Sequence, residues 1–356
     1  MTKPADGALL ALASRLAEHA GRGRAQMLTP LAGGNNNQVY LVETEAGETL
    51  ILKHYFSDPR DPRDRLAAEW GFLRHAWARG VRAVPEPLAN DAAALAGLYG
   101  FVPGRKLLAA ELEPAHIDAA ADFVLAVNAA PRDPMALEPA SEACFSLAEH
   151  LATVERRVAR LAGLDPQAPH AKAAQRFVAE ALVPAWTAVK ARLSDDARAA
   201  GLSMDQTLAA GDCCLSPSDF GFHNALADAG GAVTFLDFEY AGRDDPAKLV
   251  ADFFCQPEIP VPMRYHAGFI ARLAQGLELD TAGRARCRIL LDAYRIKWTC
   301  IILNEFLPLG AARRAFADGG SRAARGASQL AKAEAQIAGI GAQTFVTLQG
   351  NRNGLS

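Results

Sequence analysis

The chain has 356 residues and a formal net charge of −3 at pH 7, with 50% hydrophobic and 22% charged residues. This near-neutral balance gives no whole-protein electric field that would attract nucleic acid. The strongly apolar stretch 298–303 is far too short to cross a bilayer. The amino terminus lacks a signal-like apolar core with a cleavage site. The sequence therefore predicts a cytoplasmic protein with one or two substantial cores and no nucleic-acid or membrane partner.

Residues 1 to about 25 are rich in alanine and are predicted to form a leading helix. A turn rich in glycine and asparagine then precedes an alternating apolar segment. Glycine adopts positive φ without steric cost and lets backbone N–H groups approach an anion, and asparagine tolerates the same left-handed region. Such turns are also typical of ordinary hairpins. We interpret this one as a phosphate-covering hairpin, formed by Gly33, Gly34, Asn36 and Asn37.

Lys53 and Glu69 follow this turn. Lys53 closes an apolar strand, where a lysine usually only extends its charge into solvent, but its place one hairpin after the glycine turn would let it reach phosphates. Residues 63–77 carry apolar side chains at helical spacing, and Glu69 borders that stripe. The pattern predicts that Glu69 pairs with Lys53, while Arg65, Arg74 and Arg79 are exposed charges.

The middle of the chain shows helical periodicity at residues 145–161 and 177–193. The hairpins described below are predicted to interrupt the helices. Residues 284–306 are predicted to be buried on much of their surface. A helix after Pro308 is predicted to present a solvated basic face, with Arg313, Arg314, Arg322 and Arg325, and the end after Gln349 is predicted to fray.

Asp219 and Asn224 stand five positions apart in residues 215–226. In phosphoryl transfer, a carboxylate must meet the proton of the incoming hydroxyl, and an amide oxygen a short turn away can hold a magnesium ion on the nucleotide phosphates. The pair alone is also typical of residues that only cap backbone groups in a turn. His223, between them, could donate to a substrate or phosphate, or it could be structural.

Asp237 ends a short apolar run at residues 234–240. Gly230 and Gly231 mark the turn of a small hairpin, so strand pairing can bring Asp237 back beside Asn224. The neighbouring apolar residues would bury the carboxylate, which then needs a cation or hydrogen-bond donors. Asp237 and Asn224 are therefore predicted to bind Mg²⁺ together.

Six cysteines are scattered without a Cys-x-x-Cys spacing or a matching arrangement of histidines. Cys213 and Cys214 are adjacent, and adjacent cysteines seldom form an easy bridge. We predict reduced thiols that are mostly buried in the core.

In their order along the chain, the glycine turn, Lys53, Glu69, Asp219-x-x-x-x-Asn224 and Asp237 resemble the aminoglycoside phosphotransferase and choline kinase group. Residues 80–88, 97–105 and 245–252 resemble, respectively, the segment after helix C of that family, its hinge and the segment after its metal aspartate. The resemblance spans residues 28 to 255. It implies an α+β, protein-kinase-like, two-lobed fold, with a nucleotide-binding lobe at residues 1–102 that includes the leading helix, and a mostly helical lobe at residues 103–356 that holds the catalytic loops and the acceptor site.

The resemblance also implies a role for each polar position. Asp219 would be the catalytic base or the group that orients the hydroxyl. Asn224 and Asp237 would be the metal ligands, and Lys53 would anchor the phosphates with Glu69 as its partner.

The nucleotide base would lie further along the small lobe. The resemblance implies that backbone groups of Tyr99, Phe101 and Val102 hold the adenine edge. Val39 and Leu52 are predicted walls for the ring.

The chain departs from the family pattern at two places. Pro217 and Ser218 stand where most relatives have His-Gly before the catalytic aspartate, and Glu239 stands where a glycine is usual. Neither change removes a phosphate-binding group. No arginine precedes Asp219 and no Ala-Pro-Glu follows Asp237, which argues against a eukaryotic-type protein kinase switched by activation-loop phosphorylation.

The leading prediction is transfer of the γ-phosphoryl group of ATP (or GTP), with Mg²⁺, to a hydroxyl of a small molecule such as a sugar, an amino alcohol or an aminoglycoside-like metabolite. Two alternatives stay open, a non-catalytic nucleotide-binding regulatory protein and a kinase acting on a protein side chain. The acceptor, the choice of nucleotide and the oligomeric state do not follow from the sequence. The acceptor pocket has only weak candidates, which are Asp244, Asp245, Asp252, Glu258, Tyr265, Tyr294, Trp298 and Glu305.

Overall fold

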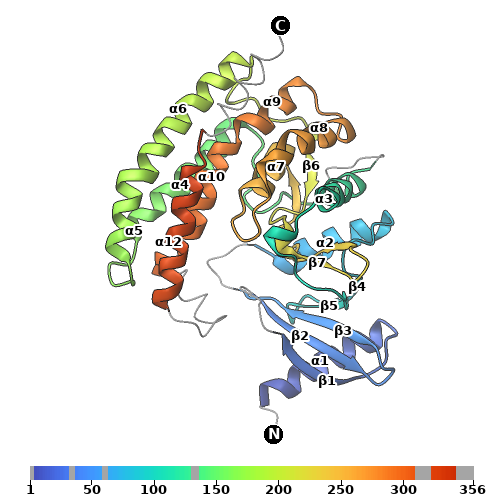
Figure 1. Ribbon diagram of the computed structural model, residues 1–356. Helices are drawn as coiled ribbons and strands as arrows, with labels where there is room; N and C mark the ends of the chain where they lie inside the picture. Colours follow the sequence, from blue (N-terminus) through green and yellow to red (C-terminus); the bar gives the residue numbers. More distant parts are fainter. Residues whose placement is uncertain (1–3, 32–36, 58–62, 130–135, 309–321, 342–356) are drawn as a thin grey trace. The chain divides into compact units, whose positions relative to one another are not determined.

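The computed structural model describes residues 4–31, 37–57, 63–129, 136–308 and 322–341. The chain divides into two compact units (Figure 1). The first unit consists of Met1–Ala143, Cys213–Asp244 and Ala267–Leu277, and the second consists of Cys144–Asp212, Asp245–His266 and Glu278–Ser356. The division into lobes at residue 102 is a different partition, and it stays a prediction.

A small antiparallel sheet begins the first unit, drawn in blue and cyan in Figure 1. Among the described residues it has five strands in the order β1-β2-β3-β5-β4. The strands are β1 (Ala25–Leu31), β2 (Gln38–Thr44), β3 (Thr49–His54), β4 (Pro87–Asp91) and β5 (Ala96–Gly100). Helix α1 (Pro4–His19) packs its small apolar residues on this sheet, which confirms the predicted leading helix.

The two faces of the sheet have different partners because side chains alternate along each strand. Tyr40, Leu52 and Leu98 stand opposite one another across β2, β3 and β5, and all three belong to the core that the sheet forms with α1. The next row, which includes Val39 and Lys53, points to the other face. The prediction that Leu52 lines the nucleotide ring is therefore wrong, since Leu52 is 0% exposed beneath α1.

Helix α2 (Arg65–Ala78) covers the predicted helical segment. Asp64 caps it by accepting a hydrogen bond from the backbone N–H of Ala67. Arg74 is exposed as predicted, but Arg65 is 3% exposed. The prediction of an exposed Arg65 is wrong, because this side chain is drawn inward by a buried carboxylate that is described below.

The remainder of the first unit holds short strand pairs beside an apolar helix. It contains η1 (Ala109–Glu111), α3 (Pro114–Val127), β6 (Cys214–Ser216), the 3₁₀ turn η6 (Phe222–Asn224), β7 (Ala225–Ala227), β8 (Val233–Phe235) and β9 (Gly242–Asp244). Strand β6 pairs with β9, and β7 pairs with β8, each in antiparallel fashion. Asn128, just after α3, fixes β6 from the side, since its amide donates to the carbonyl of Leu215 and accepts from the N–H of the same residue.

The second unit is mostly helical, as predicted for the later part of the chain. Its elements are α4 (Leu147–Arg160), η3 (Leu161–Gly163), α5 (Ala171–Phe177), the π-helical turn η4 (Val178–Leu182), α6 (Val183–Ala199), η5 (Ala210–Asp212), α7 (Pro246–Cys255), η7 (Met263–Tyr265), α9 (Thr281–Ile289), α10 (Leu291–Ile302), η8 (Leu303–Phe306) and α12 (Arg322–Ala338). All of α8 (His266–Gly276) except its first residue belongs to the first unit. None of the helices in the described part of the chain is long and apolar enough to cross a membrane.

Buried ion pairs hold the helices of the second unit together. Asp252 of α7 accepts hydrogen bonds from Lys297 at 2.8 Å and from the indole N–H of Trp298 at 2.8 Å, both on α10. Asp245 caps α7 and lies 3.3 Å from His150 of α4. These contacts give Asp245, Asp252 and Trp298 structural roles in place of the acceptor contacts considered from the sequence.

The six cysteines are all buried and unbridged, which confirms the prediction of reduced core thiols. Burial raises the pKa of Cys287 and of Cys300 to about 12, so both stay protonated thiols near neutral pH. Arg325 of the predicted basic helix lies 3.5 Å from Glu305 and is not simply solvated, whereas Arg313, Arg314 and the end after Gln349 lie outside the described residues.

Candidate functional site

Lys53 is paired with two carboxylates. Its Nζ lies 2.6 Å from Oε2 of Glu69 on α2 and 2.8 Å from Oδ1 of Asp237. Lys53 is 9% exposed, and burial alone would lower its pKa, but Asp237 and Glu69 outweigh burial and raise the pKa well above its usual range. The ammonium is therefore firmly charged, and the predicted pairing of Lys53 with Glu69 is present in the structure.

Two tyrosines extend this ion pair into the sheet. The hydroxyl of Tyr55 donates a hydrogen bond of 2.6 Å to Oε2 of Glu69, and it lies 2.7 Å from the hydroxyl of Tyr99. Burial raises the pKa of Tyr55 and of Tyr99 well above the usual value, so both hydroxyls keep their protons. Glu69 is thus held by two donors, and its position on α2 is coupled to β5.

Gly97 makes room for this tyrosine pair. It stands opposite Lys53 across the β3–β5 ladder, and a Cβ at this position would lie 2.7 Å from Cζ of Tyr99. A residue with a side chain would therefore displace the Tyr99 ring. The close approach of Tyr99 therefore explains why glycine stands at this position.

The predicted hinge positions differ in their surroundings. Tyr99 lies within β5, and its side chain is committed to Tyr55, so any contact with a nucleotide would come from its backbone. Phe101 and Val102 follow the end of the strand, and Phe101 is 46% exposed. Beyond them, Arg105 exchanges two backbone hydrogen bonds with Ala227, which ties the hinge segment to β7.

The segment around Asp219 is a tight turn. Ser218 has a φ of +67°, and the backbone N–H of Phe220 bonds to its carbonyl at 2.8 Å. The turn η6 then brings Asn224 back, so that its Nδ2 donates to the backbone carbonyl of Asp219 at 3.0 Å. Because the amide nitrogen faces that carbonyl, Oδ1 of Asn224 is the atom left for a cation.

The hairpin predicted between Asn224 and Asp237 is present. Ala225 pairs with Phe235, Gly231 turns the chain with a φ of +85°, and the N–H of Leu236 bonds to the carbonyl of Asn224 at 2.8 Å. Asp237 follows directly, with a φ of +66° and a side chain that is 42% exposed. The expectation that its apolar neighbours bury this carboxylate is therefore wrong. The hairpin thus brings the backbone of Leu236, the residue before Asp237, against the backbone of Asn224.

Aromatic packing fixes both acidic residues from behind. Phe220 follows Asp219, Phe238 follows Asp237, and both rings are buried. Phe238 stacks on Phe72 of α2 with ring centroids 4.6 Å apart, and the centroid of Phe220 lies 4.9 Å from that of Phe235. Such packing limits the freedom of the two acidic loops.

The glycine turn is described only at its end. Gly33, Gly34 and Asn36 lie outside the described residues. The side chain of Asn37 donates to Oε2 of Glu239 at 2.6 Å, and its Oδ1 accepts from the N–H of Phe56 at 3.3 Å. The side chain of Asn37 is therefore committed to the protein, and only its backbone is available for phosphate.

Glu239 also draws Arg65 inward. Glu239 is 2% exposed, and its Oε2 lies 3.8 Å from Nε of Arg65. Arg65 donates in turn to the carbonyl of Phe56 at 2.9 Å, so Asn37, Phe56, Arg65 and Glu239 form a closed ring of contacts. We call these four residues the Glu239 ring.

The structure adds polar residues that sequence reasoning missed. Tyr55 stands two positions after Lys53, so strand alternation already placed it on the same face. The partners of Arg65 and Glu239 are distant in the sequence, and no local pattern indicates them. The sequence does not decide between a substrate-binding and a structural role for His223, and in the structure its Nε2 lies 3.2 Å from Oδ1 of Asp219.

The donor set fits a magnesium ion bound together with phosphates. Within the described residues no cluster of three His, Cys, Asp or Glu side chains could hold a metal alone. Mg²⁺ is usually held by one or two carboxylates plus substrate phosphates and waters. The carboxylate of Asp237 and Oδ1 of Asn224 are oxygen donors of this kind, so the residues present fit such a site.

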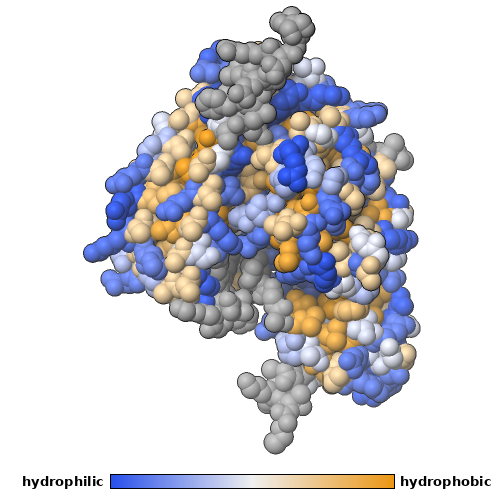
Figure 2. Space-filling view, viewed as in Figure 1, coloured by the Kyte–Doolittle hydropathy of each residue, from blue (hydrophilic) through white to orange (hydrophobic). Residues whose placement is uncertain are grey.

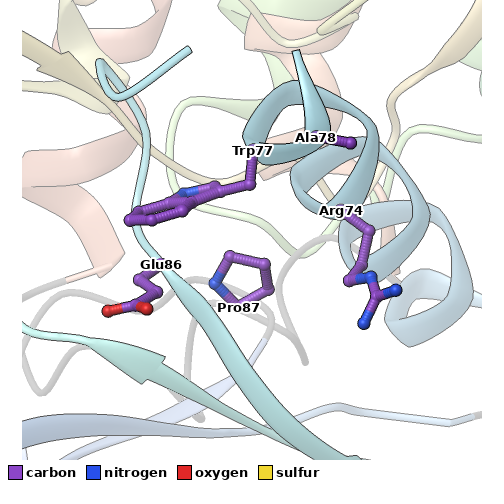
Figure 3. Close-up of a pocket in the computed structure, with 5 residues that line it drawn as sticks. All are labelled: Arg74, Trp77, Ala78, Glu86 and Pro87. Carbon is purple, nitrogen blue, oxygen red and sulfur yellow. The ribbon is translucent and has the colours of Figure 1, made fainter. Parts of the chain in front are cut away.

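A shallow recess elsewhere in the first unit does not contain these groups. It has a volume of about 250 Å³ and is lined by α2 residues and by the start of β4, as Figure 3 shows. Its lining residues are Arg74, Trp77, Ala78, Glu86 and Pro87. None of them belongs to the polar site described above, so the recess is not a candidate catalytic pocket.

Apolar side chains are visible on the surface over the small sheet in Figure 2. On the face that carries Lys53, Val39 and Ile51 are half-buried. Val39, which the sequence predicts, stays a candidate wall for the nucleotide ring. Ile51 replaces Leu52 as the second candidate.

A comparison with protein families matches residues 28–290 to a family described as phosphotransferase enzyme family. Among curated protein sequences, none matches the chain significantly.

Solved structures of small-molecule kinases are similar to this chain. Choline kinase LicA from Streptococcus pneumoniae is 14% identical, with 93% of this chain and 100% of that chain covered and a TM-score of 0.56. The ethanolamine kinase of Plasmodium vivax is 13% identical, with 86% of this chain and 82% of that chain covered and a TM-score of 0.55. Spectinomycin phosphotransferase APH(9)-Ia, solved with ADP and spectinomycin, is 13% identical, with 93% of this chain and 98% of that chain covered and a TM-score of 0.55. At these identities the likeness shows the fold, which is the α+β, protein-kinase-like fold that the sequence predicts.

Proposed function

Because the chain belongs to the phosphotransferase enzyme family, we propose that it transfers the γ-phosphoryl group of ATP or GTP to a hydroxyl of a small molecule. The observation that carries the proposal is the convergence of Lys53, Glu69 and Asp237 in one ion-paired cluster, with the Asp219–Asn224 turn bonded to the same hairpin. A sugar, an amino alcohol or an aminoglycoside-like metabolite is the proposed class of acceptor.

Each polar group has a distinct task in this proposal. Lys53, oriented by Glu69, neutralises charge on the nucleotide phosphates. Asn224 and Asp237 hold Mg²⁺, which when bound supplies positive charge to the phosphate oxygens. Backbone groups of Phe101 and Val102 bind the edge of the base, beside the apolar surface of Val39 and Ile51.

Asp219 acts on the acceptor. Its side chain is 33% exposed, and one carboxylate oxygen is bonded to His223. The other oxygen accepts a hydrogen bond from the acceptor hydroxyl, aligns it with the γ-phosphorus and takes its proton as the new P–O bond forms. The bond from the γ-phosphorus to the β,γ-bridging oxygen breaks in the same step, and the nucleoside diphosphate leaves. The loose transition state of phosphoryl transfer needs positioning more than strong basicity.

The solved neighbours support the proposed class of acceptor. Their names specify choline, ethanolamine and spectinomycin, which are all small hydroxyl-bearing molecules. The alternative of a non-catalytic nucleotide-binding protein is disfavoured because all five polar positions are present and Lys53, Glu69 and Asp237 are in contact. A kinase acting on a protein side chain stays the second alternative, and the proposed location is the cytoplasm.

The first experiment is phosphoryl transfer from labelled ATP with Mg²⁺, against a pooled panel of sugars, amino alcohols and aminoglycosides. Asp219→Asn should lower transfer by about 100-fold or more while nucleotide binding is kept. Asp237→Asn should weaken binding of the Mg²⁺–nucleotide complex itself. Asp195→Asn is the matched control, because Asp195 is exposed and pairs with Arg198 on the surface.

The outcomes separate the alternatives. Label that moves to one acceptor with the wild type and with Asp195→Asn, but not with Asp219→Asn, supports the proposal. Wild-type transfer by Asp219→Asn would refute the assigned role of this carboxylate. Nucleotide binding without any transfer to the panel would instead favour a regulatory protein or a protein acceptor.

A further inference from the structure

His223 contacts the carboxylate that the proposed reaction depends on. Its Nε2 lies 3.2 Å from Oδ1 of Asp219, four positions earlier. The contact follows from the local fold, because η6 turns the chain back after Gly221 and the amide of Asn224 fastens the turn to the carbonyl of Asp219.

The hydrogen bond determines which nitrogen of His223 carries a proton. A carboxylate oxygen can only accept, so Nε2 must be the donor. In the neutral ring Nδ1 is then an acceptor. Nδ1 is buried, and among the described residues it has no hydrogen-bond partner.

A buried acceptor without a partner destabilises a fold, and an apolar ring of the same shape would avoid this loss. His223 is therefore a poor choice for stability at its position. The contact with Asp219 is the interaction that the imidazole supplies and an apolar ring cannot supply.

We propose that His223 is a positioning residue that fixes the rotamer of Asp219, so that Oδ1 is occupied and Oδ2 faces the acceptor hydroxyl. This inference rests on the proposed function, in which Asp219 receives the hydroxyl proton. Without the His223 contact the carboxylate, which is one-third exposed, would rotate among several orientations and meet the hydroxyl less often.

The test compares His223→Phe with His223→Gln. Phenylalanine keeps a planar ring and removes both nitrogens, whereas glutamine keeps an N–H donor at similar reach. His223→Phe should lower kcat by about 10- to 100-fold with KM for the nucleotide unchanged, a loss typical of residues that orient a functional group. Its melting temperature should equal or exceed that of the wild type, and His223→Gln should recover most of the lost kcat.

A control histidine separates this role from general packing. His75 of α2 contacts the backbone carbonyl of Val127 through Nε2. His75→Phe should lower the melting temperature and leave kcat unchanged, which is the opposite pattern.

The outcomes distinguish failure of this inference from failure of the proposed function. Wild-type kcat in His223→Phe, an equal loss in the Phe and Gln variants, or a loss matched by unfolding would overturn the inference. If Asp219→Asn is inactive while His223→Phe is fully active, only the positioning role fails. If Asp219→Asn is fully active, the proposed function itself fails. In the Asp219→Asn background His223→Phe should cause no further loss of transfer, because the carboxylate that His223 positions is already absent.

Discussion

Asn37 and Glu239, 202 positions apart in the chain, share a hydrogen bond of 2.6 Å. Asn37 ends the glycine-rich turn and Glu239 stands two positions after Asp237, so this bond joins the two segments assigned to phosphate and to metal. Glu239, which stands where the family usually has glycine, therefore links these two segments, and its carboxylate also lies 3.8 Å from Nε of Arg65.

Asn37→Ala should lower the free energy of unfolding by about 1–3 kcal/mol, because a buried carboxylate loses a donor. We also expect a raised KM for the nucleotide, since the end of the glycine turn is released. Denaturant unfolding and nucleotide titration measure the two effects. Asn90→Ala on β4 is a control at an exposed asparagine and should change neither quantity. Unchanged stability and KM in Asn37→Ala would show that the Glu239 ring has no energetic role.

Gly97→Ala should destabilise the protein by about 1–3 kcal/mol, because the new Cβ would overlap the Tyr99 ring. The displaced ring should also loosen Tyr55 and Glu69, and KM for the nucleotide should rise. Thermal unfolding and kinetics measure the two effects. Gly7→Ala in α1 is the matched control, since a Cβ added at Gly7 would meet nothing within 4 Å, and it should be neutral or stabilising. Equal behaviour of the two variants would contradict this account of Gly97.

Ser218→Gly should be tolerated and should raise the free energy of unfolding by up to about 1 kcal/mol. Ser218 has a φ of +67°, a region that strains residues with a Cβ and suits glycine. Ser218→Val should instead lower stability by about 1–3 kcal/mol, because a β-branched residue is poorly suited to this region. Both values come from denaturant unfolding, and a Val variant as stable as the Gly variant would contradict the argument.

The stability of the second unit should fall at alkaline pH through His150. Burial alone would lower the pKa of His150, but hydrogen bonds with Asp245 and Cys144 outweigh burial and raise it to about 9. The stabilisation by charged His150 is thus fully present below the unfolded pKa of about 6.5, and it is lost as the pH rises toward 9.

The measurement is urea unfolding of the wild type and His150→Gln at pH 6 and pH 9. The difference between the two proteins should shrink at pH 9 by up to about 3 kcal/mol. A difference that stays constant between these pH values would mean that His150 is not charged in the folded protein.

Sequence reasoning succeeded where local patterns carry the information. The glycine pair Gly230–Gly231 predicted the hairpin, and the backbone bond from Leu236 to Asn224 confirms it. The pairing of Lys53 with Glu69 followed from a strand end and a helix stripe. The roles assigned to these residues in catalysis stay predictions.

The sequence predictions were wrong where the face of a strand, or a partner distant in the sequence, determines the position of a side chain. Leu52 was placed beside the nucleotide although it neighbours Lys53 in β3, and adjacent strand residues point to opposite faces. Arg65 was judged exposed because its partner Glu239 is far away in the sequence. Tyr99 was assigned only through its backbone, since no pattern indicates that its hydroxyl meets Tyr55.

The contact of Lys53 with Asp237 pairs two opposite charges at the place where phosphate and metal are proposed to bind. Each group serves as the counterion of the other, across 184 positions of sequence. If a Mg²⁺–nucleotide complex binds as proposed, Asp237 would pair with the metal and Lys53 would pair with the phosphates, so each residue would keep an opposite charge. Metal-free nucleotide would supply only half of these pairings and would leave Asp237 facing added negative charge, so the protein should discriminate against it.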